Sequence, residues 1–202
     1  MAKGDDRLEI LYDMDRAKWR RWLEKNYEQT ASVWLVLVKK GATRKGISYV
    51  EAVEEALCFG WIDSSPNRLD DERFKIHMSP RKPNSVWARS NKERVRRLIE
   101  QGVMTPAGME KIEAAKRNGS WDIIEEVDAL KVPEELEKAL LSHPPAKASF
   151  ESFIPSYRKQ AIYWVLSAKR PETKAKRAEE IARSAARNEK VNQWVAKERK
   201  GA

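Results

Sequence analysis

The residues best suited to chemistry gather in one stretch of the chain, from Cys58 to Asn91. It holds a Gly-Trp-Ile-Asp turn, a lone histidine, a Pro-Arg step and a Ser/Trp/Asn group before a helix. An arginine can bind a carboxylate or phosphate through paired hydrogen bonds, and the free N–H groups of a helix start favour an anion. The stretch therefore predicts a ligand-binding site for a small anion, formed by Trp61, Asp63, Arg81, Ser85, Trp87 and Asn91.

The arginine and serines of this stretch also have a structural interpretation. Ser85 or Ser90 could simply cap the helix, since nearly every helix needs a cap. Arg81 could then form an ion pair with Asp63 or Asp70. The sequence leaves both interpretations open.

The other members of the stretch leave alternatives open as well. Trp61 and Trp87 could wall a pocket, or lie in the core with the indole N–H satisfied. Asn91 could bridge two loops. Asp63 could be a general base, an anchor for the arginine or a turn residue. His77 alternates with apolar residues along a predicted strand and could be solvated or shuttle a proton. An enzyme that uses Asp63, His77 and the arginine is thus one alternative function.

Composition excludes several kinds of site. The chain has one cysteine and two histidines among 202 residues, so it predicts no internal disulfide, metal site or cofactor. Cys58 ends an apolar helix and is expected to be buried and inert. The single cysteine, the lack of an apolar run of ~20 residues and an N-terminus without a signal-peptide core predict a cytoplasmic protein without a transmembrane segment.

The charge is basic and unevenly distributed. The formal net charge is +9. Residues 73–98 contain nine basic residues and one acid, and residues 155–202 contain thirteen and five. Such segments could bind nucleic acid, although no nucleic-acid-binding motif is present. They could equally be the solvated faces of long helices.

Capping signals place the helices of the first half. Asp15 predicts an N-cap for a helix that runs to about Tyr27. Ser48 and Glu51 form a capping box, and Gly60 ends the helix that follows.

Apolar and β-branched runs place the strands. Residues 33–38 are apolar throughout, which predicts a strand buried on both faces. A strand at 61–63, a turn at 65–67 and strands at 67–70 and 73–78 should follow. The predicted fold class is α+β, with a small, mostly antiparallel sheet, packed helices and a helical C-terminal part.

The rest of the chain reads as helices. Ser90 and Glu93 form a second capping box, although that helix could begin as early as Ser85. Thr105-Pro106 starts another helix, and Asn118-Gly119 stops it.

The predicted domain boundary falls at His143-Pro144-Pro145. Residues 1–143 form an α+β core domain and 144–202 a helical extension. In that extension, Ser156 should cap a helix, Pro171 interrupts, and the last helix has only a thin apolar stripe, with which it could dock or project into solvent.

Three segments in order resemble the YdeI/OmpD-associated family, often labelled bacteriocin-protection proteins: ISYVEAVEEALCFGWIDS, then SPRKPNSVWARSNKERVRRLIEQGVMTPAGMEKIEAAKRNGSW, then YRKQAIYWVLSAKRPETKAKRAEEIA. The resemblance runs from about Arg16 to Arg183, and Ala88 departs from the pattern Ser-x-Trp-Ser. It implies a bacterial α+β protein linked to tolerance of bacteriocins or envelope stress, without an established reaction or cofactor. We therefore expect a non-catalytic stress-tolerance protein that binds a small anion or a protein partner.

Overall fold

The computed structural model describes residues 8–191. The chain divides into two compact units, Met1–Asn118 and Gly119–Ala202.

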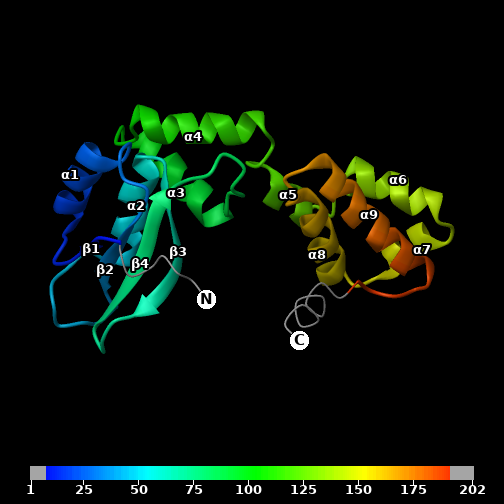
Figure 1. The fold of residues 1–202 in the computed structure, drawn as a ribbon, viewed down its shortest axis with the longest axis horizontal. Coiled ribbons are helices and arrows are strands. Elements are labelled where there is room, and N and C mark those ends of the chain that lie inside the picture. The colour runs from blue at the N-terminus through cyan, green and yellow to red at the C-terminus, as the bar shows by residue number, and fades with distance from the viewer. Residues whose placement is uncertain (1–7, 192–202) are drawn as a thin grey trace. The chain divides into compact units, whose positions relative to one another are not determined.

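A four-stranded sheet forms the centre of the first unit (Figure 1). Its strands are β1 (Ile10–Leu11), β2 (Val33–Val38), β3 (Trp61–Arg68) and β4 (Arg73–Pro80), in the spatial order β1-β2-β4-β3. β1 is parallel to β2, and the two other pairs are antiparallel. The predicted α+β class and the mostly antiparallel sheet are therefore confirmed.

Strand β2 is the apolar centre of this sheet, as its sequence predicts. Val33, Leu35 and Leu37 are fully buried on one face, and Trp34 and Val36 are 4% and 5% exposed on the other. The Lys75 ammonium lies 4.4 Å from the centre of the Trp34 ring and helps to cover it.

The turn predicted at 65–67 is wrong, because β3 runs through it. The register shifts between Asp63 and Pro66, so the proline lies at a strand irregularity. Because β3 is an edge strand, the missing N–H of Pro66 interrupts no inner ladder. The turn follows at 69–72, where the Asp70 carboxylate accepts the backbone N–H groups of Glu72 and Arg73 at 3.0 and 2.7 Å.

Four helices belong to the first unit: α1 (Arg16–Asn26), α2 (Tyr49–Cys58), α3 (Arg89–Glu100) and α4 (Pro106–Arg117). Three predicted caps are confirmed. Asp15 accepts the Lys18 N–H at 2.8 Å, and both bonds of the Ser48–Glu51 capping box are present. Thr105 accepts the N–H of Gly108.

The second predicted capping box is wrong. Helix α3 begins at Arg89 with Ala88 as its N-cap and has no side-chain cap bond. Ser90 therefore lies inside the first turn. Trp87, just before the helix, is 1% exposed. Its burial fixes the chain where the helix starts, so tertiary packing rather than a cap sets this boundary.

The second unit is helical over its described residues: α5 (Ile123–Asp128), α6 (Glu134–Ser142), α7 (Ala146–Ser152), α8 (Pro155–Leu166) and α9 (Pro171–Ala186). Its core extends from Val127 to Ala185, around a fully buried Phe150. The thin stripe of α9 lies in this core, and α9 packs on α6, α7 and α8. The last helix thus docks on its own unit.

Two details of the second unit differ from the sequence-based expectations. Helix α8 begins at Pro155 with Ile154 as its N-cap, so the cap predicted at Ser156 is wrong. The helices α5 and α7 had not been predicted. His143-Pro144-Pro145 does break the chain between α6 and α7, inside this unit. The domain boundary predicted there stays a prediction.

Candidate functional site

Arg81 is a buried cation that lacks a full set of partners. It follows β4, is 4% exposed, and stacks on Trp87 with 3.7 Å between the guanidinium carbon and the ring centre. Its Nη2 donates to the Val86 carbonyl at 2.7 Å, whereas Nε and Nη1 have no hydrogen-bond partner. Burial lowers the pKa of Arg81 to about 10, and the charge of Asp63 acts in the opposite direction.

The carboxylates expected near this arginine have other partners. Asp63 accepts a hydrogen bond from the Tyr49 hydroxyl at 2.9 Å, and Asp70 pairs with Arg73 at 2.7 Å. Burial, and then Asp63, raises the pKa of Tyr49. Within residues 8–191, no carboxylate lies at ion-pair distance from Arg81. The interpretation in which an aspartate pairs with Arg81 is therefore wrong.

Both candidate tryptophans lie in the core, at 1% exposure each. The Trp61 indole donates to the carbonyl of Tyr27 at 3.1 Å and packs edge-on against Trp19 and Trp22. Trp87 has its ring face covered by the guanidinium of Arg81. The interpretation of both tryptophans as core residues is therefore supported. In the contacts that the structure describes, neither ring has an open face on which a flat ligand could stack.

The structure brings Asp63 and Trp87 near Arg81, whereas the Asn91 side chain is engaged elsewhere, since it accepts from Arg94 at 2.9 Å. The backbone N–H of Ser85 donates to the carbonyl of Lys82 at 3.0 Å, so this N–H is not free for an anion.

His77 lies on the other face of the sheet from Asp63. Asp63 pairs with Met78 in the β3–β4 register, and adjacent strand residues point to opposite faces. The His77 ring instead contacts Trp34, with 5.4 Å between ring centres, and lies 3.4 Å from the Ser64 hydroxyl. An acid–base pair of Asp63 and His77 is therefore not assembled.

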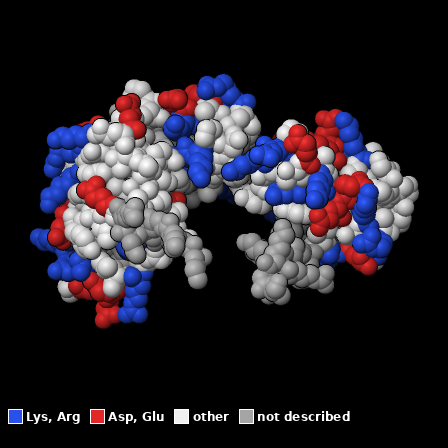
Figure 2. Space-filling view, viewed as in Figure 1, with Lys and Arg blue, Asp and Glu red and all other residues white. Residues whose placement is uncertain are grey.

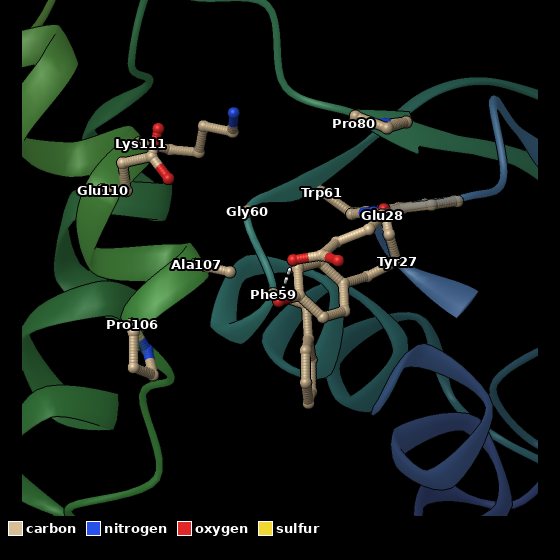
Figure 3. A pocket seen from close by; sticks show the side chains of 10 residues that line it. All are labelled: Tyr27, Glu28, Phe59, Gly60, Trp61, Pro80, Pro106, Ala107, Glu110 and Lys111. Carbon is tan, nitrogen blue, oxygen red and sulfur yellow. Dashed lines mark hydrogen bonds between the residues drawn. The ribbon is translucent and has the colours of Figure 1, made fainter. Parts of the chain in front are cut away.

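The first unit also contains a cavity of about 400 Å³ that borders the tryptophan turn (Figure 3). The residues that follow α1 form one wall, the α2–β3 junction the floor, and the first turns of α4 the opposite wall. Its lining residues are Tyr27, Glu28, Phe59, Gly60, Trp61, Pro80, Pro106, Ala107, Glu110 and Lys111. This size lies within the usual range for small-molecule pockets.

Gly60 lets the floor of this cavity approach α4. Its φ of +71° ends α2 in the left-handed region. A Cβ there would lie 2.6 Å from the Lys111 side chain and 3.0 Å from the Ala107 carbonyl. The predicted helix stop is confirmed, and the close approach is a second reason for glycine at this position.

Charged groups stand at the rim of the cavity. The Tyr27 hydroxyl donates to Glu28 at 2.8 Å, as the dashed line in Figure 3 shows. That bond, burial and the charges of Glu28 and Glu110 together raise the pKa of Tyr27. Lys111 brings a positive charge to the same rim.

Sequence reasoning found the floor of this cavity but missed its walls. Gly60 and Trp61 belong to the stretch that the sequence singled out. Tyr27, Glu28 and the residues of α4 are far away in the sequence, and no motif joins them. The helix start at Thr105-Pro106 was the one available signal, and it predicts where α4 begins. It does not predict which residues α4 faces.

In the described parts of the two basic segments, residues 73–98 and 155–191, several basic side chains form intramolecular ion pairs. Arg97 pairs with Glu54, Lys174 with Glu135 and Arg183 with Glu179, at 2.7–3.1 Å. Basic and acidic residues are interspersed over the visible face of each unit (Figure 2). These contacts favour solvated helix faces over a nucleic-acid interface.

Cys58 is fully buried as predicted, and burial raises the pKa of its thiol to about 11, which disfavours the reactive thiolate. Among residues 8–191, no group of three potential metal ligands is found. No helix of that range is long and apolar enough to cross a membrane.

Fold and site thus define a two-unit α+β protein whose first unit contains a buried arginine with two unsatisfied nitrogens, Nε and Nη1, and a cavity of about 400 Å³. Residues 11–111, half of the chain, match the family model described as Domain of unknown function (DUF8412), and the chain belongs to that family. Residues 129–188 match the family model described as Bacteriocin-protection, YdeI or OmpD-Associated. No curated protein and no solved structure gives a match.

The second family match confirms the resemblance seen in the sequence and locates it. Of the three segments that carried the resemblance, the third, from Tyr157 to Ala182, lies within residues 129–188. The predicted ligand-binding residues between Trp61 and Asn91 lie in the part that matches the family of unknown function. The bacteriocin-protection match therefore gives these residues no role.

Proposed function

We propose that the protein is a non-catalytic bacterial protein of bacteriocin-protection or stress tolerance, and that it binds a small carboxylate- or phosphate-bearing ligand at Arg81. The match of residues 129–188 supports the first part. The observation that carries the second is the 4% exposed guanidinium whose Nε and Nη1 have no partner. A cytoplasmic location belongs to the proposal and rests on the single cysteine.

Desolvation is the physical argument for an anion at this position. A buried charge without hydrogen bonds costs several kcal/mol, so buried arginines are normally paired or hydrogen-bonded throughout. The ring of Trp87 occupies one face of the guanidinium, which leaves donors at its edge. An anion that accepts from Nη1 or Nε would satisfy those donors and restore the ordinary pKa of the arginine.

Asp63 fits the proposal as a neighbour that tunes the site. Its charge acts on Arg81, yet its carboxylate is engaged by Tyr49. It therefore offsets part of the buried positive charge without occupying the donors. Trp61, Ser85 and Asn91 are retained in the proposal as residues near the ligand, although the Trp61 indole donates to Tyr27 and the Asn91 amide oxygen accepts from Arg94.

Anion binding can be measured on the full chain by calorimetry with inorganic phosphate and acetate. We expect Arg81→Gln to weaken binding by about tenfold or more, since a hydrogen bond to a charged group contributes about 1.5–3 kcal/mol. Lys82→Gln removes the same charge from the next, exposed position and is the matched control. Equal affinities for wild type, Arg81→Gln and Lys82→Gln would overturn the site.

Stability and phenotype separate a binding role from a structural one. Arg81→Met should unfold within about 1 kcal/mol of the wild type despite the burial of this side chain, because replacing poorly paired buried charge by apolar volume is often neutral or stabilising. The same variant should lose protection when bacteria that express it are challenged with a bacteriocin. A strongly destabilised Arg81→Met, or undiminished protection by the folded variant, would contradict the proposal.

A further inference from the structure

The cavity beside Trp61 has a chemistry different from that of Arg81. Two carboxylates, Glu28 and Glu110, stand at its rim, and one ammonium, Lys111, stands with them. Tyr27 is the half-buried aromatic residue of the lining, whereas Phe59 and Trp61 lie below it at 4% and 1% exposure. A negative rim beside the Tyr27 ring is an arrangement that attracts organic cations, because carboxylates and aromatic rings both favour positive charge.

The geometry points to a binding site for the basic side chain of a polypeptide, an alkyl guanidinium or alkyl ammonium that enters the cavity beside Tyr27 and Trp61. Its charged end would lie between Glu28 and Glu110, and its aliphatic stem would contact the rings and Pro106. The site is independent of Arg81 and of the anion proposed there.

Charge complementarity argues for this occupant. The Tyr27 hydroxyl holds the Glu28 carboxylate at 2.8 Å, so that acid is positioned before any ligand arrives. Glu28 and Glu110 line the same cavity, so a cation within it would meet both charges. Within residues 8–191, neither of the two has an ion-pair partner, so both charges remain available.

One ring of the lining already takes part in such an interaction within the protein. The guanidinium of Arg20 lies 5.3 Å from the centre of the Phe59 ring. The centres of the Tyr27 and Phe59 rings are 5.7 Å apart. Lys111 is the opposing feature, because its ammonium repels a cation. The first part of its stem lies close to Gly60.

The test uses the full chain and Nα-acetyl-L-arginine amide, with the neutral isostere Nα-acetyl-L-citrulline amide as the comparison ligand. Binding is followed by NMR at the Trp61 indole N–H. We expect the arginine compound to bind at least tenfold more tightly than the citrulline compound. Equal binding of the two would overturn the inference, since shape rather than charge would then decide.

Substitutions of the rim residues should change the affinity in opposite directions for a cationic and an anionic ligand. Glu28→Gln and Glu110→Gln should each weaken binding about two- to fivefold, as expected for exposed charges. Lys111→Gln should strengthen it. Glu113→Gln, on the same helix but outside the lining, is the matched control and should change nothing. A weaker complex with Lys111→Gln would overturn the cation and indicate an anionic guest.

A cavity-filling variant locates the guest without changing any charge. Ala107→Leu should abolish binding by occupying the space beside α4. If it fails to fold, the two glutamine variants still decide. Arg81→Gln should leave arginine-amide binding unchanged, and Glu110→Gln should leave phosphate binding unchanged. Failure of either proposal is therefore distinguishable from failure of the other.

Discussion

Glu51 shows how one side chain links local structure to pH. Its Oε2 accepts from the Ser48 N–H at 2.9 Å and from the Ser48 hydroxyl at 2.7 Å. These bonds lower the pKa of Glu51. A carboxyl group whose pKa is lower in the folded state stabilises the fold above its unfolded pKa, about 4.3. That contribution is lost as the pH falls through the folded pKa.

We expect Ser48→Ala to cost about 1 kcal/mol at pH 7, the usual cost of a lost N-cap. Glu51→Gln keeps an acceptor but removes the titrating group, so its stability should fall less than that of the wild type below about pH 4.3. Urea unfolding at pH 7 and pH 3.5 measures both. If the wild type and Glu51→Gln lose the same free energy over this range, the bonds at Ser48 do not control the pKa.

At the residue scale, caps could be predicted and buried polar partners could not. Asp15, Ser48 and Thr105 act through bonds to residues three positions away, so sequence spacing contains the whole interaction. Arg81 was singled out by residue type, but its contacts depend on a turn that brings Val86 and Trp87 back to it. Its lack of a carboxylate partner is a fact of tertiary structure.

At the element scale, a close crossing of α2 and α4 forms one side of the cavity. A Cβ on Gly108 would lie 2.4 Å from the carbonyl oxygen of Cys58 and 2.8 Å from that of Leu57. Both are backbone atoms, which cannot move alone. Thr105 adds a hydrogen bond of 2.6 Å to the same Cys58 carbonyl. At Gly108 the backbone of α4 therefore lies directly against the backbone at the end of α2.

Gly108→Ala should destabilise the protein, which is the opposite of the usual effect of a glycine-to-alanine change in a helix. Within a helix this change normally stabilises by up to about 1 kcal/mol. Here we expect a net destabilisation of about 2 kcal/mol or more, because overpacking forces α4 away from α2. Chemical denaturation measures it. Gly119→Ala, where a Cβ meets nothing within 4 Å, carries only the cost of its φ of +79° and should be milder. A Gly108→Ala protein as stable as the wild type would show that the helices can separate freely.

Element types were easier to predict than their limits. The apolar run of β2 and the start of α4 are local signals, and both are confirmed. Pro66 looked like a turn residue because prolines usually interrupt strands, yet an edge strand accommodates it. Helices α5 and α7 have six and seven residues, too few for a clear helical period in the sequence.

At the scale of the whole molecule, each unit has its own core. The buried cluster of the second unit lies entirely between Val127 and Ala185, and it includes Leu136 and Leu140 of α6. Those two leucines lie before His143, on the far side of the boundary that the sequence suggested. The two possible boundaries therefore lead to different predictions of which isolated C-terminal fragment can fold.

We expect residues 119–202 expressed alone to fold, with helical circular dichroism and a cooperative thermal transition, because their core is complete. Residues 144–202 lack α5 and α6, leave the partner face of α9 exposed, and should not fold cooperatively. Ile181→Asp in the longer fragment is the control, since it places a charge in the core. Cooperative folding of 144–202 would instead support a boundary after residue 143.

Gly60 has a consequence for how the cavity could change between related proteins. A side chain at this position would be strained by the φ of +71° and crowded by α4, so we expect little variation at the floor of the cavity. Glu28, Glu110 and Lys111 stand on flexible stems above it. A change in ligand specificity should therefore arise by substitution of these charged residues at the rim, while glycine is kept at the floor of the cavity.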